Sequence, residues 1–538
     1  MFRSIFRAIL EQNIEHRPLF DKKAFIIRSI EGYNLNWGTK SKKQGVVTMK
    51  NAISALLIFC LILSSSACSK TKKATDTSSE TSPSEKTSAT EKETETEAES
   101  ETETEPEPTT EITFPDPLPV SNEYFPDSYF LGYVSENIDT DSDGFLSNEE
   151  REAVKVIEIN STFELTSLVG IEHFPNLTEL SFEGGYVTSL DASRNPALEF
   201  IDCYCNEITE LDASGCANLK RIFGQTNPIT KMNVTGCTSL ESVDLGIADL
   251  DTLTGLSDCK NLKELWIGQV DIHDLTLSAL PKLEILSCRV PNLSELDTSH
   301  NPALKDLRVI GKTGQLDVSQ NPELECLGIE GWGDASIDFS SPPDLSHNPK
   351  LCYIAISGSN LRSIDLSNNP ALESVNFAMN PDLTELDLSA NPKVNYLSCY
   401  GNALTSINIS NNPDLEEILC DNNCLSEIDI SGNPKLRVLQ CGNNKITSLD
   451  TSSCPLLTNL CCNDNELTSL DLSKNSALYN LEAFNNDIKE LNVHGIKAFS
   501  YLKDQEPTLR DGICEYIYEE DFDFYYSIMC DPETKVIF

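Results

Sequence analysis

Leucines recur along most of this chain in a fixed relation to polar positions. Five segments between residues 394 and 486 read VNYLSCYGN, LEEILCDNN, LRVLQCGNN, LTNLCCNDN and LYNLEAFNN, and they start about 21 residues apart. Within each segment apolar and polar positions alternate, which is typical of a strand on a half-buried sheet. A second alternating segment such as TSLDLS follows, and x-N-P or x-G-C ends it. The pattern therefore predicts two short strand-like segments in every repeat.

The repeats extend over residues 155–498 as roughly fifteen coils. This repeat length and spacing of leucines are typical of leucine-rich repeats. One coil cannot bury its own apolar face, so successive coils must stack. We therefore predict a leucine-rich-repeat solenoid of the α/β class, rich in parallel in-register strands, with a helical N-terminal cap over 114–154 and a β cap over 499–538. The coil from Leu324 carries an insertion and the coil from Leu304 is slightly short, which marks an irregularity in mid-stack.

Cysteines recur at two positions of the coil. One inward position is occupied by Cys203, Cys288, Cys399, Cys420, Cys441 and Cys462. A second position, where sister coils have Asn, is occupied by Cys216, Cys237 and Cys454. In-register neighbours would have parallel Cβ vectors about 4.7–4.9 Å apart, whereas a disulfide needs converging Cβ atoms about 3.8 Å apart. We expect buried free thiols, and Cys514 with Cys530 is the one pair we consider for a bridge.

Asn and Asp also recur at fixed positions of the coil. The recurrent Asn residues after the first segment are Asn206, Asn227, Asn402, Asn423, Asn444, Asn465 and Asn486. Buried side chains of this kind are expected to bond the turn backbone of adjacent coils. The second segment carries Asp191, Asp212, Asp297, Asp317, Asp365, Asp429, Asp450 and Asp471. Because stacked like charges repel, each Asp is expected to bond turn amides or neighbouring Ser hydroxyls.

The repeats resemble a known family. LTSLDLSxNPxLxxLxCxxNxL is similar to the Cys-containing repeats of internalin J, and ELTSLVGIEHFPNLTEL resembles the opening repeats of internalins generally. The likeness covers the solenoid, roughly three-fifths of the chain. Internalins are surface adhesion or invasion proteins, so the resemblance implies partner binding on a concave face. We see no LPxTG sorting signal of the kind that anchors internalins, and a host-invasion role is therefore not carried over.

Outward aromatic side chains mark the expected concave face. The candidates for partner binding are Phe200, Tyr204, Phe223, Trp266, Tyr353, Tyr396 and Tyr400. Aromatic side chains on a rigid sheet are anchors that suit protein or carbohydrate partners. Scattered exposed aromatics are also ordinary on any surface, so both interpretations stay open. Acidic neighbours such as Glu416, Glu417 and Asp421 favour a basic or neutral partner.

Residues 139–150 match a calcium-binding EF-hand loop. The ligand positions are Asp139, Asp141, Asp143, Phe145 through its backbone carbonyl, Ser147 and Glu150. Gly144 stands where the loop turns sharply, and a Glu at the twelfth position binds Ca²⁺ bidentately. A solvated acidic loop is the alternative. Because we find no second loop, we predict one structural Ca²⁺ site in an N-terminal cap and no paired sensor or dockerin.

The N-terminal region predicts export. Met49-Lys50, an apolar run over 52–63 and small residues before Cys68 describe a lipoprotein signal peptide over 49–67, with Cys68 as the lipidated residue. An ordinary cleaved signal is the alternative. We interpret residues 1–48 as leader sequence upstream of a true start at Met49. Residues 68–113 are Ser, Thr, Glu and Lys with few apolar side chains, which predicts a disordered linker.

Composition narrows the class of function. The net charge of −45 argues against nucleic acid or anionic lipid as a partner. The chain has six His and shows no phosphate loop, nucleophile elbow or zinc pattern, so we expect no enzyme. The leading hypothesis is a lipid-anchored bacterial cell-surface protein that binds a protein ligand, as a monomer, and touches the membrane through its lipid only. The alternatives are a glycan-capturing lipoprotein and a passive envelope component.

Overall fold

The computed structural model describes residues 115–538 apart from short internal gaps. These gaps are residues 160–163, 247, 271–274, 291–292, 313, 332–338, 340, 504, 511–512 and 522–523. The leader, signal peptide, linker and lipidation site at Cys68 lie outside the described residues. Residues 332–338 and 340, within the insertion of the coil from Leu324, also lie in these gaps.

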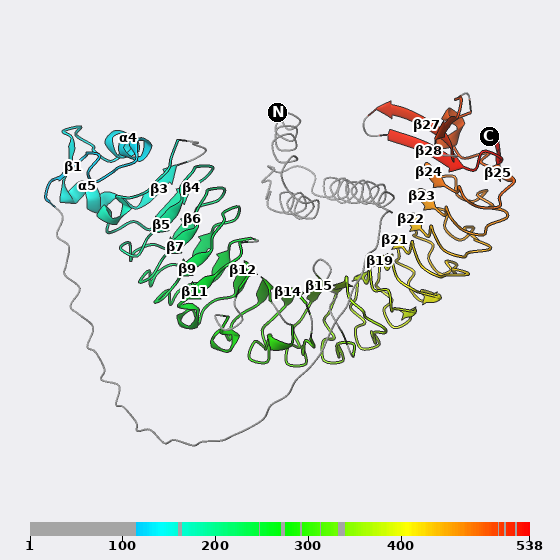
Figure 1. The fold of residues 1–538 in the computed structure, drawn as a ribbon, viewed down its shortest axis with the longest axis horizontal. Helices are drawn as coiled ribbons and strands as arrows, with labels where there is room; N and C mark the ends of the chain where they lie inside the picture. Colours follow the sequence, from blue (N-terminus) through cyan, green and yellow to red (C-terminus); the bar gives the residue numbers. More distant parts are fainter. Residues whose placement is uncertain are drawn as a thin grey trace, which may run out of the picture. The chain divides into compact units, whose positions relative to one another are not determined.

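The first strand-like segments of successive coils form one long parallel sheet. Its strands, in spatial order, are β3 (Val156–Ile159), β4 (Glu179–Phe182), β6 (Phe200–Asp202), β8 (Arg221–Phe223), β10 (Ser242–Asp244), β12 (Glu264–Gln269), β13 (Ile285–Arg289), β14 (Asp306–Gly311), β15 (Cys326–Gly331), β16 (Tyr353–Ser357), β17 (Ser374–Asn376), β19 (Tyr396–Ser398), β21 (Glu417–Leu419), β22 (Val438–Gln440), β23 (Asn459–Cys461) and β24 (Asn480–Glu482). The sheet lines the inner side of the curved solenoid (Figure 1).

The sheet is in register because each coil places a buried apolar residue at the same point. Ile201 pairs with Ile222, and Ile418 pairs with Leu439, each in the middle of its strand. All four side chains are at most 1% exposed. A slip by one residue would turn the leucines to solvent, so the apolar pattern specifies the register. The predicted leucine-rich-repeat solenoid is therefore confirmed.

The second segments form ladders in part of the solenoid only. β5 (Ser189–Asp191), β7 (Glu210–Asp212), β9 (Lys231–Asn233) and β11 (Thr252–Thr254) make one parallel sheet. β18 (Glu385–Asp387) and β20 (Ser406–Asn408) make a second pair. The 3-10 turns η1 (Ile171–His173), η2 (Leu256–Asp258), η3 (Leu277–Ala279) and η4 (Leu293–Glu295) occupy other positions.

The prediction of two strands in every coil is therefore wrong for the described coils between η2 and β18, and again between β20 and β25. The physical reason is curvature. In an arc the outer path is longer than the inner one, so outer segments separate beyond the spacing of about 4.7–4.9 Å that a ladder requires. The inner sheet keeps its hydrogen bonds and the outer side loses some of them.

The N-terminal cap is a small helical unit. It contains β1 (Leu118–Pro119), α4 (Ser128–Asn137), β2 (Phe145–Leu146) and α5 (Asn148–Ala153). Asp127 caps α4 by accepting hydrogen bonds from the amides of Tyr129 (2.9 Å) and Phe130 (2.8 Å). The other oxygen of the same carboxylate accepts from the Thr166 amide (2.9 Å) and hydroxyl (2.6 Å), at the start of the solenoid. These bonds tie the cap to the first coil.

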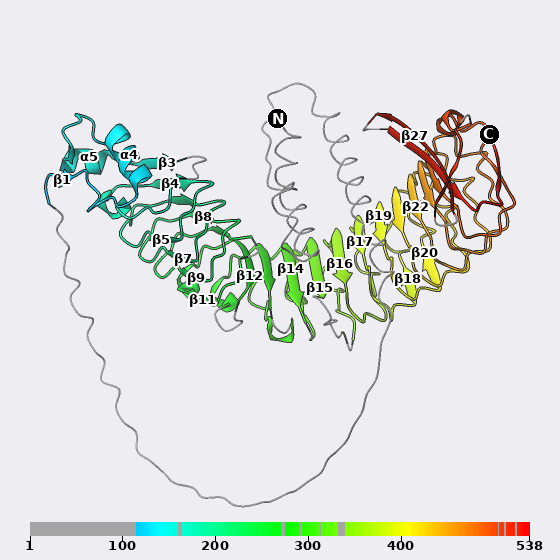
Figure 2. The same ribbon diagram turned by 45° about the horizontal axis from the view of Figure 1, so that its top comes forward.

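The C-terminal cap continues the main sheet. It contains η5 (Ala498–Tyr501), β26 (Thr508–Arg510), β27 (Ile513–Asp521), β28 (Phe524–Cys530) and β29 (Lys535–Ile537). β28 pairs in parallel with β24, β27 runs antiparallel to β28 (Figure 1), and β29 pairs with β25 (Glu490–Asn492). Figure 2 shows β27 at the C-terminal end of the solenoid. The last coil thus gains a partner strand, which covers an edge that would otherwise attract other chains.

The cysteines of the inward position are buried free thiols, as expected. Cys399, Cys420, Cys441 and Cys462 are free and 0% exposed. Burial raises the pKa of the Cys399 thiol well above its usual range, and the Asp421 charge adds to this. These thiols are therefore small core residues and not reactive groups. Cys514 and Cys530 lie directly opposite each other in the terminal hairpin, both as free thiols.

The recurrent Asn side chains bond the backbone of adjacent coils. Asn423 donates from Nδ2 to the Cys399 and Cys420 carbonyls (2.9 and 3.0 Å), and its Oδ1 accepts from the Leu404 amide (3.0 Å). A second buried position, where Asn precedes Pro in most coils, behaves alike. There Asn412 donates from Nδ2 to the Asn391 carbonyl at 2.7 Å.

In some coils cysteine stands at this second position in place of Asn, and its thiol still supplies a hydrogen-bond donor. The Cys216 thiol donates to the Ala192 and Asn195 carbonyls at 3.3 and 3.5 Å. A thiol is a weaker donor than an amide, but it satisfies the same carbonyls. The exchange of Asn for Cys is thus an exchange of hydrogen-bond donors, a role that the sequence pattern did not reveal.

Candidate partner-binding face and calcium loop

The inner sheet presents the predicted aromatic side chains outward. Phe200, Phe223, Trp266, Tyr353 and Tyr396 occupy strand positions that flank the buried central residue, and all are half-buried. The two remaining candidates, Tyr204 and Tyr400, follow β6 and β19 and are also half-buried.

The aromatic candidates fall into two groups. Tyr204 and Phe223 stack with ring centroids 6.1 Å apart and an interplanar angle of 23°. Farther along, Tyr396 follows Tyr353 by two strands, with Ser374 between them in the register. Burial raises the pKa of Tyr396 to about 12, and the Glu417 charge adds to this, so its hydroxyl stays a neutral donor.

A cation lies over one aromatic ring of this face. The Arg308 guanidinium carbon is 5.9 Å from the Trp266 ring centroid. Asp306 holds Arg308 in place through two hydrogen bonds, Nε to Oδ1 at 3.0 Å and Nη2 to Oδ2 at 3.1 Å. Gly328, on the next strand, lies beside the aliphatic part of Arg308, and a Cβ there would meet the Arg308 Cγ at 3.5 Å, an ordinary van der Waals contact. The sheet thus already binds one guanidinium by an ion pair and a ring face.

Carboxylates that sequence reasoning missed lie near the N-terminal end of the same face. Glu158, Ser181 and Asp202 align on consecutive strands, and the row continues through Phe223 and Asp244. Burial raises the pKa of Asp202, although the Tyr204 amide opposes this. An alignment of the successive coils, with residues compared at the same position of each coil, would have found this row.

The edge of the sheet carries an alternating ladder of opposite charges, which was also missed. Residues of consecutive coils form ion pairs at the position before each main strand: Glu199 with Lys220 at 2.6 Å, Glu241 with Lys263 at 2.8 Å, and Glu284 with Lys305 at 2.7 Å. All six side chains are solvent-exposed, so each pair contributes little to stability. Alternation avoids stacking like charges, which favours in-register coils.

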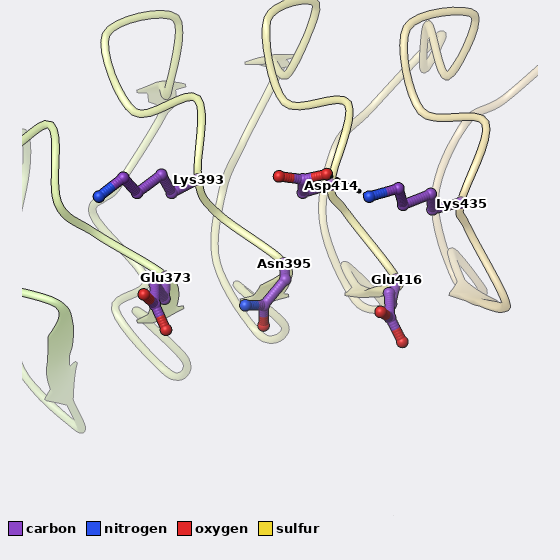
Figure 3. Close-up of a pocket in the computed structure, with 6 residues that line it drawn as sticks. All are labelled: Glu373, Lys393, Asn395, Asp414, Glu416 and Lys435. Carbon is purple, nitrogen blue, oxygen red and sulfur yellow. Dashed lines mark hydrogen bonds and ion pairs between the residues drawn. The ribbon is translucent and has the colours of Figure 1, made fainter. Parts of the chain in front are cut away.

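This alternation breaks farther along, where a shallow polar depression forms. Figure 3 shows Glu373, Asn395 and Glu416 in one row of successive coils and Lys393, Asp414 and Lys435 in the other. Lys435 donates to Asp414 at 2.5 Å. Glu416, expected on the concave face, thus lies at its edge. The lining is polar and open, so it lacks the enclosed apolar walls of a small-molecule site.

The calcium loop has the expected helix–loop–helix frame between α4 and α5. One carboxylate oxygen from each of Asp139, Asp141 and Asp143 lies within 4.8 Å of the others. Gly144 turns the loop with φ +83°, and its amide donates to Asp139 at 3.0 Å. Oxygen donors gathered in this way fit a hard cation such as Ca²⁺.

Glu150 is not gathered with the three aspartates. Its carboxylate accepts from the Thr140 amide and hydroxyl, both at 2.7 Å, and from the Ser147 amide and hydroxyl, both at 2.9 Å. Burial alone would raise the pKa of Glu150, but these hydrogen bonds outweigh it and lower the pKa to about 2. Ser147 and Glu150 form a capping box at the start of α5. Bidentate binding of an ion would therefore require the Glu150 side chain to rotate.

The loop pairs with an upstream strand and not with a second loop. Leu146 of β2 opposes Leu118 of β1, and the Val120 amide donates to the Gly144 carbonyl at 3.0 Å. Leu118 and Leu146 are both 0% exposed. β1 thus fills the place of a partner loop and joins the loop to the core of the cap.

No protein-family model matches this chain, and none of the curated proteins matches it. Solved structures do match. The functional domain of InlJ from Listeria monocytogenes, which includes a cysteine ladder, is 25% identical, with 70% of this chain and 73% of that chain covered and a TM-score of 0.49. An internalin, InlF, from the same organism is 20% identical, with 66% and 98% covered and a TM-score of 0.46.

A third match comes from plants. The peptide hormone receptor RGFR1 in complex with RGF2 is 17% identical, with 66% of this chain and 63% of the receptor covered and a TM-score of 0.53. The likeness to the receptor agrees with the fold described above. Within the described residues, no helix has the length and apolar character needed to cross a bilayer.

Proposed function

We propose that this chain is a bacterial cell-surface lipoprotein that binds a protein partner on the inner sheet of its solenoid. The observation that carries the proposal is the set of half-buried aromatic side chains on a rigid, in-register sheet. Rigid aromatic anchors lose little conformational entropy on binding and dominate the energy of protein interfaces. The likeness to the plant receptor, which holds a peptide hormone, supports the fold of the proposed binding protein.

Affinity capture from envelope and host-surface extracts with the full chain tests this function. Trp266→Ala and Tyr396→Ala should each weaken capture of a specific protein by about tenfold or more, because interface aromatics are common hot spots. Tyr479→Ala is the matched control, since Tyr479 is exposed at the sheet edge, before β24. Loss of glycan retention in place of protein capture would indicate the glycan-binding alternative. Equal capture by all variants would contradict the proposed face.

Anchoring through Cys68 is the second part of the proposal. It is supported by the apolar run and small residues that precede this cysteine. Metabolic labelling with a palmitate analogue should mark the full chain and should fail with Cys68→Ala. The control is Cys205→Ala, which removes an exposed thiol of the solenoid. Labelling that survives Cys68→Ala would exclude this anchor.

A structural calcium site is the third part. Asp139, Asp141 and Asp143 would hold the ion with the Phe145 carbonyl, Ser147 and a rotated Glu150. The bound ion would neutralise their mutual repulsion and stiffen the cap that covers the first coil.

A further inference from the structure

The N-terminal part of the inner sheet carries a regular row of carboxylates. Glu158, Asp202 and Asp244, here called the acidic row, lie on β3, β6 and β10. In-register pairing places one strand between each of them and the next, with Ser181 and Phe223 in the intervening positions. Two strand spacings amount to about 9.4–9.8 Å. The acidic row therefore repeats at about this distance along the solenoid.

Asp202 of the row and the neighbouring Glu183 lie in surroundings that favour a cation. Burial raises the pKa of Glu183, beside the row, and the charges of Asp202 and Glu158 raise it further. Asp202 accepts a hydrogen bond from the Tyr204 amide at 3.1 Å, and no ion pair between described residues includes Asp202 or Glu183. Partly desolvated carboxylates that repel one another are stabilised when a positive group approaches.

Aromatic rings lie between and beyond the carboxylates. Phe223 aligns between Asp202 and Asp244, and Trp266 follows Asp244. A cation bound between Asp202 and Asp244 would therefore meet a ring as well, whereas Ser181 lies between Glu158 and Asp202. Arg308, which pairs with Asp306 of its own strand and lies over Trp266, shows that a guanidinium on this sheet can combine a carboxylate with a ring face. Arginine suits such a position better than lysine, because its planar group both pairs with carboxylates and stacks.

The spacing of the row selects a peptide conformation. A polyproline II helix rises about 3.1 Å per residue with three residues per turn, or about 9.3 Å per turn. Every third side chain of such a helix points the same way at nearly the repeat of the acidic row. In an extended β-strand side chains alternate between the two faces. Residue i+3 therefore points to the side opposite residue i.

We propose that the acidic row is a docking surface for a basic, extended peptide segment of polyproline II type with Arg at every third position. The segment lies across the strands, along the solenoid axis, with each Arg between neighbouring carboxylates. This inference rests on the proposed function and identifies the partner chemistry for the N-terminal part of the face.

Calorimetry with the full chain and two peptides tests the inference. One peptide consists of Arg-Pro-Pro repeats, and the other has the same composition with every Arg at one end. The repeat peptide should bind about tenfold more tightly or better, because only its Arg spacing matches that of the carboxylates. Its affinity should fall as salt rises, because the contacts are ionic.

A double variant, Asp202→Asn with Asp244→Asn, should reduce the affinity of the repeat peptide to that of the clustered peptide. Asn keeps one oxygen, which can accept from the Tyr204 amide at position 202 and from the Gly246 amide at position 244. The Gln225 side chain, which donates to the other Asp244 oxygen at 2.6 Å, can turn its own amide oxygen toward the new Asn nitrogen, so the fold should persist. The control, Glu427→Gln with Glu466→Gln, removes the same charge from exposed positions elsewhere. Circular dichroism checks folding, and Glu158→Gln provides a second test of the row.

Equal affinity for the two peptides, or an unchanged affinity in the double variant, would overturn the inference. Either result leaves the proposed function standing if a captured protein still depends on Tyr396. Conversely, spacing-dependent peptide binding without any captured protein would support the acidic row and contradict the choice of Tyr396 as an anchor.

Discussion

The two ends of the inner sheet share one core and differ in the surface built on it. Around β3–β10 the outward positions carry the acidic row with Phe200, Tyr204 and Phe223. Around β19–β24 they carry Tyr396 and Tyr400 with amide and apolar side chains, and their carboxylates, Glu417 and Glu482, lie on β21 and β24 without forming such a row. The buried central residues are alike in both regions. A solenoid can therefore change its partner chemistry from coil to coil without changing its fold.

Matched core truncations should give the largest effect and should not distinguish the two regions. Ile222→Ala and Leu439→Ala remove fully buried side chains from β8 and β22. Each should lower the free energy of unfolding by about 2–5 kcal/mol, because the cavity adds to the lost burial. Urea denaturation measures both, with Gln440→Ala as the surface control. A difference of several kcal/mol between the two variants would mean that the regions do not share one kind of core.

Calcium should stabilise the N-terminal region specifically. At a free Ca²⁺ concentration about 100 times Kd, binding would add about 2.7 kcal/mol to the stability of the cap. EDTA should therefore lower the first melting transition of the full chain, and Asp141→Asn should abolish that shift. The control, Asp464→Asn, removes an acid from the C-terminal region. An EDTA effect of equal size in Asp141→Asn would place the ion elsewhere.

The recurrent Asn residues after the first segment should contribute most to stability where consecutive coils all carry them. Asn423→Ala removes donors to the Cys399 and Cys420 carbonyls and the acceptor of the Leu404 amide. Leaving these buried groups unbonded should cost about 1–3 kcal/mol, measured by urea denaturation. Cys216→Ala, at the second position near the N-terminal end, should cost less because a thiol donates weakly. The reverse order would show that thiol packing outweighs hydrogen bonding.

A carboxylate on the inner side and one on the outer side of the solenoid should change stability in opposite directions as pH changes. These effects should be smaller than those of the variants above. Burial raises the pKa of Asp421 to about 7, against the Gly442 amide that donates to it. The folded state then binds the proton more tightly than the unfolded chain, so stability should decrease as pH rises from about 4 to 7 through this group. Asp421→Asn should raise Tm at pH 8 and leave it nearly unchanged at pH 4.

Asp429 on the outer side is the matched opposite. Hydrogen bonds from the Ser431 side chain and amide lower the pKa of Asp429. Its contribution to stability is present above the unfolded pKa and is lost as pH falls through the folded one. Asp429→Asn should therefore lower Tm slightly at neutral pH, with no difference in strong acid. A Tm increase at pH 8 in both variants would refute this contrast.

Parts of the site were predictable to different degrees. The aromatic positions followed from counting along each coil, because side chains alternate along a strand. The cluster of Asp139, Asp141 and Asp143 followed from ligand spacing, but the hydrogen bonds that hold Glu150 away from these aspartates did not. That position depends on the Thr140 and Ser147 donors, whose orientation only the folded loop sets.

By itself the sequence determined the solenoid, its register and the buried thiols, since a repeat of fixed length with a fixed apolar pattern leaves one way to bury its leucines. Only the tertiary structure decided which side chains of different coils become neighbours. Asp202, Phe223 and Asp244 are about twenty residues apart in the chain, yet consecutive strands bring them side by side. Their contact depends on strand spacing and curvature, which arise when the coils stack.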